Sequence, residues 1–348
     1  MSVPNYPLNH PSAQKRWSPQ LFKQMLKSCY ASRFFGTGKD SLIQVFSDLQ
    51  KNPGDKITIS LRKLLSGAGV AGDGVLEGAE ESMNFYTDSF IVDQLRHAVR
   101  TGGRISEQRV SWSSRDEARD GLADWWADRI DTSFFNQLAG NTGETDVRYT
   151  GLQAPAAPTA AYLAGSDVAT TASLSITHTF KLEYLDYLLE RAKTRDYPMR
   201  PLGGSGAGAN YVCFITEQQR TDLMVDAGTN QWADLTKNAR ERSVSNPIFS
   251  GADIVYRGVI VHSTTRLPRT NVSGSVYANR AVFCGAQAGA AAFCRGNGPT
   301  TFSWEEQKFD YSNQLGVAAG SLFGMKKTQF ESTDYAVLTM TTAGQDHG

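Results

Sequence analysis

The sequence is poor in cysteine and has no excess of either charge, and both shortages exclude classes of protein. Four cysteines stand without Cys-x-x-Cys spacing, which argues against a zinc site or a disulfide framework and favours buried free thiols. The 35 basic and 35 acidic residues cancel to a formal net charge of +0, without a like-charge block at either end. A dedicated nucleic-acid binder carries a basic patch, so any contact with DNA is expected to be diffuse.

Long apolar runs are also missing. The longest weakly apolar stretch, 281–294, is closed by Arg280 and Arg295 and is shorter than the ~20 residues of a membrane-spanning helix. The first residues, MSVPNYPLNHPSAQKRW, lack the apolar core of a signal peptide. We therefore expect no membrane segment and no export by a signal.

The sequence contains no complete motif for catalysis, cofactor binding or metal binding. The glycines of 203–210 precede a strand, whereas a dinucleotide loop must follow one, and in GTGKDS, 36–41, Asp40 stands where a phosphate loop needs Ser or Thr. The five histidines lie singly, and adjacent Glu305 and Glu306 would point to opposite faces of an extended chain. We predict no catalytic residue, no cofactor and no metal site.

An extended flap is the first positive feature. KITISLR, 56–62, alternates apolar and polar residues as a half-buried strand does, and 83–92 is rich in β-prone residues. Between them lies SGAGVAGDGVLEGAEE, which is rich in glycine and acid and has nothing to pack. The pattern predicts a two-stranded flap with a flexible tip. Because an isolated hairpin is marginal in water, we expect it to rest on another molecule.

A long amphipathic helix follows, starting with Ser114 and Glu117 as a capping box and ending before Gly140. Its apolar residues recur at three- and four-residue steps: Ala118, Leu122, Trp125, Trp126, Ile130, Phe134 and Leu138. Such a helix spans about 37 Å and is predicted to be the spine of an elongated body. The stripe through Leu122 and Ile130 makes Trp126, rather than Trp125, the inner tryptophan.

The remainder is predicted to be a mixed α+β unit with closing strands. We expect a helix over 180–193, a buried strand YVCFI at 211–215, and a helix capped by Thr216 and Gln219. DIVYRGVIVHS is typical of strands, and RAVFCGAQAGAAAF of a strand that runs into a helix of small residues. The tail, 301–342, is predicted to contain strands that return to close the body.

Six blocks in this order resemble the major capsid protein family of podovirus N-four type phages, and with it the Hong Kong 97-type capsid fold. They are GDKITISLRKLLSGAGVAGDGVLEGAEE, IVDQLRHAVRTGG, SEQRVSWSSRDEARDGLADWWADRID, NPIFSGADIVYRGVIVHSTTRLP, CGAQAGAAAF and WEEQKFDYSNQLGVAAGSLFGMKKTQFESTDYAVL. The resemblance covers roughly residues 40–342. It departs at Glu217, where we expect proline in that family; either residue suits the first turn of a helix.

The resemblance implies five parts along the chain. These are an N-terminal arm over 1–50, an extended loop over 51–106, a peripheral domain with the spine helix over 107–177, an axial domain over 178–300, and return strands of the peripheral domain with the C-terminus over 301–348. The assembly interface in the extended loop is expected at Arg62, Lys63, Asp73, Glu77, Glu80 and Glu81. The spine-helix core is expected at Leu122, Trp126, Ile130 and Phe134.

The function implied is that of a major capsid protein, which assembles with itself into pentamers and hexamers of an icosahedral phage head. The implied partners are the portal protein, optional scaffolding and decoration proteins, and packaged double-stranded DNA held non-specifically, with no membrane. The protein would be made in the cytoplasm of the bacterial host and reside in the virion. Two alternatives stay open at this point: an encapsulin-type nanocompartment shell, and an enzyme with an unrecognised site.

Overall fold

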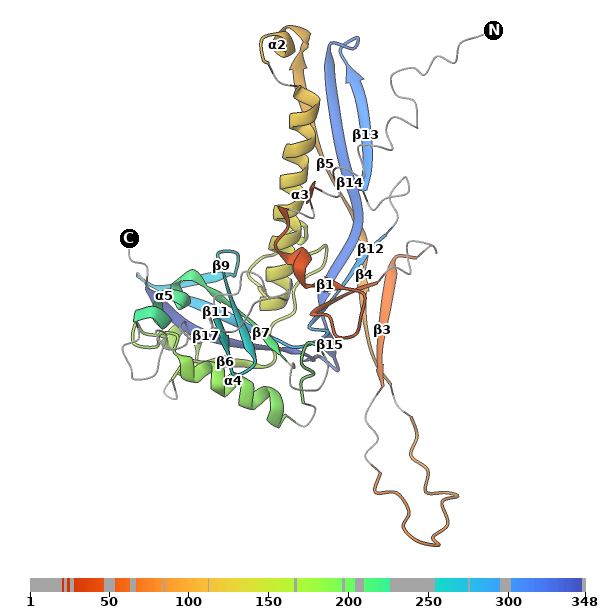
Figure 1. Cartoon of the computed structure of the whole chain (residues 1–348), viewed down its shortest axis with the longest axis vertical. Helices are drawn as coiled ribbons and strands as arrows, with labels where there is room; N and C mark the ends of the chain where they lie inside the picture. The colour runs from red at the N-terminus through yellow and green to blue at the C-terminus, as the bar shows by residue number, and fades with distance from the viewer. Residues whose placement is uncertain are drawn as a thin grey trace.

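The computed structural model shows an elongated body, a side lobe and a protruding hairpin (Figure 1). It describes residues 21, 24–25, 28–46, 54–62, 67–83, 85–111, 113–165, 168–195, 198–203, 210–225, 254–274, 276–294 and 302–345. Helix and sheet are both prominent, which confirms the expected α+β class.

A first sheet, here called the spine sheet, runs along the elongated body. Its strand order is β1 (Phe35–Gly36), β2 (Ile43–Phe46), β12 (Gly289–Phe293), β14 (Gln314–Lys327) and β13 (Phe302–Phe309), with β5 (Asp93–Gly103) paired to the other side of β14. Helix α3 (Ser114–Ala139) lies along β14 and β5 in Figure 1. The short helix α2 (Arg104–Gln108) follows β5 at the far end of the body.

Helix α3 extends as predicted, but its N-terminal cap lies one residue earlier than expected. The cap is Ser113, whose hydroxyl accepts a hydrogen bond from the Asp116 backbone N–H, so the predicted Ser114 and Glu117 pairing is wrong. Ser113 takes this role because its backbone is extended while Ser114 is already helical. Gly140 ends the helix in the left-handed conformation, as predicted, with φ 61°.

The apolar stripe of α3 packs against the spine sheet. Trp126 is fully buried and meets the rings of Phe302 and Phe323 edge-on, at centroid distances of 4.9 and 6.0 Å. Trp125 is only partly buried and stacks on His97 of β5 at 4.4 Å. Edge-on aromatic pairs add to the stabilisation that burial alone provides.

A second sheet, here called the lobe sheet, forms the core of the side lobe. Its order is β6 (Ala161–Leu163), β17 (Val337–Gln345), β11 (Val276–Cys284), β7 (Tyr211–Thr216), β9 (Val259–Thr264) and β8 (Ile254–Tyr256), with β10 (Arg269–Ser273) on β11. Helices α4 (Leu182–Thr194) and α5 (Glu217–Val225) lie against this sheet. Thr216 and Gln219 cap α5 reciprocally, at 2.9 and 3.3 Å, which confirms that cap.

Three parts of the chain differ from the sequence-based expectation. The small residues after Cys284 form strand β12 instead of a helix, because they lie between β2 and β14, where a Cβ on Gly289 would come within 2.7 Å of Ile43. No strand was predicted over 93–103, where β5 forms. The tail divides between the sheets: β13 and β14 join the spine sheet, whereas β17 joins the lobe sheet.

The predicted flap is present. Strand β3 (Lys56–Arg62) pairs antiparallel with β4 (Phe85–Ile91), and both extend away from the body in Figure 1. A smaller hairpin of β15 (Gln329–Phe330) and β16 (Thr333–Asp334) connects the spine sheet to the lobe sheet. The 3-10 turns η1 (Ala31–Phe34), η3 (Val147–Tyr149) and η4 (Thr171–Ser173) complete the described elements.

Candidate assembly surfaces

The tip of the flap, residues 67–83, is exposed at every position and has no regular secondary structure. Of the predicted interface residues, Asp73, Glu77, Glu80 and Glu81 all lie in it. Glu80 accepts a hydrogen bond from the Gly78 backbone N–H, and Glu81 from that of Gly67, each at 2.7 Å. The tip therefore presents carboxylate groups to solvent and to any molecule that contacts it.

Of the two basic residues predicted for the same interface, only Arg62 lies within the described residues. Arg62 is the last residue of β3, opposite Phe85 in the register. Lys63 lies outside the described residues, so its position stays a prediction. The structure therefore groups the four acids in the tip and leaves Arg62 on the strand.

The base of the flap is tied to its own chain. Ile57 and Phe90 pack on Ala290 and Ala292 of β12 in a small apolar cluster. Asp88 of β4 binds Lys326 of β14 at 2.5 Å. The expectation that the flap rests on another molecule stays a prediction, but part of the flap's base already packs on the spine sheet of its own chain.

Large apolar side chains are exposed along the flap. They are Val70, Val75, Leu76, Met83, Phe85 and Ile91. At the opposite end of the body, Tyr311 in the β13–β14 turn is 105% exposed and Ile105 of α2 is 67% exposed. Exposed apolar groups of this kind mark sites of protein contact.

The spine-helix residues predicted for the core, Leu122, Trp126, Ile130 and Phe134, are all buried, each at 0–1% exposure. The described part of the N-terminal arm packs on the same helix: Cys29 donates to the Asp131 carboxylate at 3.1 Å, and the backbone N–H groups of Tyr30 and Ala31 donate to it at 3.0 and 2.7 Å. A buried carboxylate satisfied in this way fixes the chain that donates to it.

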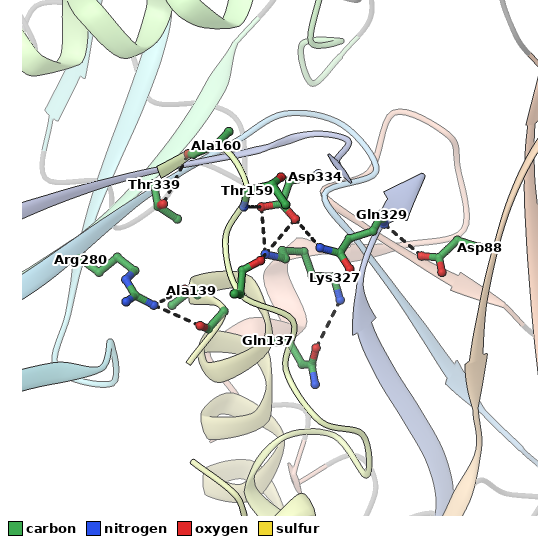
Figure 2. A network of polar contacts seen from close by, with 12 residues as sticks. Asp88, Gln137, Ala139, Thr159, Ala160, Arg280, Lys327, Gln329, Asp334 and Thr339 are labelled. Atoms are coloured by element: carbon green, nitrogen blue, oxygen red, sulfur yellow. Dashed lines mark hydrogen bonds and ion pairs between the residues drawn. The ribbon is translucent and has the colours of Figure 1, made fainter. Parts of the chain in front are cut away.

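A buried ion pair links the end of β14 in the spine sheet to the β15–β16 hairpin (Figure 2). Lys327 ends β14 and Asp334 ends β16; the Lys327 Nζ lies 2.9 Å from each carboxylate oxygen, and the side chains are 0% and 1% exposed. Thr159 donates its backbone N–H to Asp334 at 2.9 Å, and Gln329 donates its side-chain amide at 2.8 Å. Burial lowers the pKa of Lys327, while the charge of Asp334 opposes that shift.

A second polar contact connects the lobe sheet to the end of α3. Arg280 of β11 donates to the carbonyl oxygens of Ala139 and Gly140, at 2.7 and 3.1 Å (Figure 2). A cation at the C-terminus of a helix satisfies carbonyl groups that have no partner within the helix and complements the helix dipole. The spine helix is thereby attached directly to the lobe sheet.

Sequence reasoning missed Asp131, Arg280, Lys327 and Asp334 as structural contacts. A signal existed for two of them, because Asp131 interrupts an apolar helix face and Lys327 follows the apolar run LFGM. Asp334 gave none, because the contact that ties it to a distant part of the chain, with Thr159, spans 175 residues. Only the fold brings these groups together.

The described residues show no arrangement for chemistry. Nowhere in the described ranges do three or more potential metal ligands gather. Burial raises the pKa of the Cys213 thiol to about 12, and the thiols of Cys29, Cys284 and Cys294 are shifted in the same direction. Within the same residues, no helix is both long and apolar enough to cross a membrane.

A spine helix on a long sheet, a side lobe and a projecting flap define a shell-forming subunit of the Hong Kong 97-type capsid fold. The sequence profile described as phage capsid protein matches residues 5–346, so the chain belongs to the phage capsid protein family. The major capsid protein of Pseudomonas phage KPP25 is 29% identical to it over 350 residues, covering 91% of this chain and 89% of that protein.

Solved structures agree. The capsid of Ralstonia phage GP4 is 29% identical, has a TM-score of 0.81 and covers 100% of both chains. The capsid of cyanophage Pam1 matches with a TM-score of 0.71 over 100% of this chain and 97% of that one, at 17% identity, which shows the fold alone. The family resemblance predicted from the six sequence blocks is confirmed.

Proposed function

We propose that this chain is the repeating subunit of an icosahedral phage head, assembling as pentamers and hexamers around packaged double-stranded DNA. The observation that carries the proposal is the combination of a well-packed body with an exposed apolar and acidic flap tip, within a phage capsid protein fold. A surface that is unsupported within its own chain is stabilised by a neighbouring copy.

The finer parts of the proposal follow from the same architecture. The arm, extended loop, peripheral domain and axial domain are assigned to 1–50, 51–106, 107–177 and 178–300, with the chain end over 301–348. The C-terminal strand β17 lies in the lobe sheet, so the axial part includes 337–345. The proposed partners are the portal protein and, optionally, scaffolding and decoration proteins. The protein is made in the cytoplasm of the bacterial host and resides in the virion.

DNA is held weakly in this proposal. The 35 positive and 35 negative residues leave no net attraction for phosphate, so the packaged DNA is neutralised mostly by counterions. The family match favours a phage shell over an encapsulin-type compartment.

Light scattering of the purified full chain tests the proposal. The expected result is a reversible rise from small oligomers to particles of megadalton mass as protein concentration increases. A chain that stays monomeric at every salt and protein concentration contradicts it.

A further inference from the structure

Two Asp–Gly dipeptides occur in the sequence, and the fold places them in opposite environments. Asp73–Gly74 lies in the flap tip, where every residue of 67–83 is exposed and none belongs to a helix or strand. Asp120–Gly121 lies inside helix α3, away from both of its ends. The same pair of residues therefore occurs once in open chain and once in a hydrogen-bonded helix.

An aspartate that precedes a glycine is able to react with its own main chain. The backbone nitrogen of the glycine attacks the aspartate Cγ, a C–N bond forms, and a carboxyl oxygen leaves as water, which takes up the amide proton. The product is a cyclic succinimide. Water then adds to either carbonyl carbon of the ring, and addition at the former main-chain carbonyl gives isoaspartate. The composition of the chain is unchanged, and no oxidant or cofactor is consumed.

The flap tip allows this reaction, because the aspartate lies in unrestrained backbone and the amide next to it carries no side chain. Gly72 has φ +65°, and glycine on both sides of Asp73 gives the main chain the freedom to bring Cγ to the Gly74 nitrogen. A Cβ on Gly74 would lie 2.5 Å from the Val70 Cγ1, so the bend over 70–74 favours glycine at this position. The tip thus keeps the reactive pair in a solvent-exposed segment.

Helix α3 prevents the same reaction at Asp120–Gly121. In a helix, the N–H of an interior residue donates to the carbonyl oxygen four residues earlier, so the Gly121 nitrogen is held away from the Asp120 side chain. The Asp120 carboxylate is paired with Arg119, whose Nε and Nη2 lie 2.7 and 2.6 Å from it. Reaction at this bond requires the helix to open locally, which has a free-energy cost that the flap tip does not have.

We propose that Asp73–Gly74 is a site of spontaneous modification, at which the aspartate of the free subunit isomerises to isoaspartate through a succinimide. The main chain of the product runs through the β-carbon of residue 73, and its free carboxylate is the α-carboxylate. The tip is therefore lengthened by one carbon atom and its charge is displaced. Asp120–Gly121 stays unmodified while α3 is folded. This inference concerns the subunit before assembly and does not depend on the proposed function.

Isoaspartate labelling of the aged protein tests the proposal. The purified full chain is incubated for days at neutral pH, its isoaspartyl groups are methylated by an isoaspartyl carboxyl methyltransferase, and peptide mapping assigns the label. The peptide with Asp73 should carry at least about tenfold more label than the peptide with Asp120, because only the latter bond has to wait for local opening. In Asp73→Glu the tip peptide should lose its label, since the longer side chain must close a larger ring.

The same incubation in denaturing urea separates the effect of the fold from that of the dipeptide. Without α3 the two Asp–Gly bonds should acquire label at similar rates. Equal labelling of both bonds in the folded chain, an unlabelled tip peptide, or a tip peptide that stays labelled in Asp73→Glu overturns the inference. An Asp120 peptide that remains unlabelled in urea overturns the explanation by helix protection.

Discussion

At the scale of single residues, the ion pair between the end of β14 and the β15–β16 hairpin combines charge with almost complete burial. Lys327 and Asp334 are expensive to remove from water, and their mutual attraction with the surrounding hydrogen bonds offsets that cost. Removing one member therefore harms the fold more than replacing both.

The change Asp334→Asn should destabilise the subunit by about 3–5 kcal/mol, because it leaves the Lys327 ammonium buried without its counter-charge. The double variant Lys327→Met with Asp334→Leu should recover most of that loss. Urea unfolding of the parent and both variants measures it. Equal destabilisation by the single and the double change would show that the pair has another role.

The tryptophans of α3 offer a test of the spine. Trp126→Ala should cost about 3–5 kcal/mol and abolish soluble subunit, since the side chain is fully buried against Phe302 and Phe323. Glu77→Ala, in the exposed flap tip, should leave a folded subunit. Thermal unfolding decides between these outcomes; normal folding of the Trp126 variant together with failure of the Glu77 variant would refute the assignment of spine and flap.

Buried thiols give the fold a predictable response to alkaline pH. Burial raises the pKa of Cys213 from 9.0 to about 12, so the unfolded thiol ionises while the folded thiol stays neutral. The stabilisation is complete below pH 9 and is lost as pH rises to about 12, with a slope of at most about 1.4 kcal/mol per pH unit. The free energy of unfolding, measured with urea over that pH range, should fall more steeply with pH for the parent than for Cys213→Ala. Equal slopes would show that the thiol is not buried.

At the scale of elements, local sequence signals predicted those structures whose causes are local. The apolar stripe and Gly140 located α3, and alternation located β3. Strand β12 was missed because Ala290, Ala291 and Ala292 favour a helix locally, and only the narrow space between β2 and β14 makes them a strand.

Two glycines of the α3 region should respond oppositely to alanine. A Cβ on Gly121 meets nothing within 4 Å, so Gly121→Ala should stabilise the subunit by about 0.5–1 kcal/mol through helix propensity. Gly140 has φ +61° and a Cβ on it would lie 2.5 Å from the Ala156 carbonyl oxygen, so Gly140→Ala should destabilise by about 2 kcal/mol or more. Calorimetric melting of both variants measures this; a stabilising Gly140→Ala would contradict the described end of the helix.

At the scale of the whole molecule, the contacts are unevenly distributed. Lys327 and Asp334 form a buried pair between β14 and the β15–β16 hairpin, and Arg280 attaches the lobe sheet to the end of α3. The chain around Ala31 is fixed to α3 through Asp131. The flap tip, residues 67–83, is by contrast exposed at every position. A subunit built in this way keeps its body as a unit and leaves the tip to be ordered by its neighbours.

Electron microscopy of the purified full chain tests the central claim most directly. The account predicts closed particles of uniform diameter whose walls resolve into hexamers and pentamers, with the flap of each subunit lying on the next. The account would be contradicted by a protein that stays monomeric, or that forms open sheets and filaments in place of closed shells, at every salt and protein concentration.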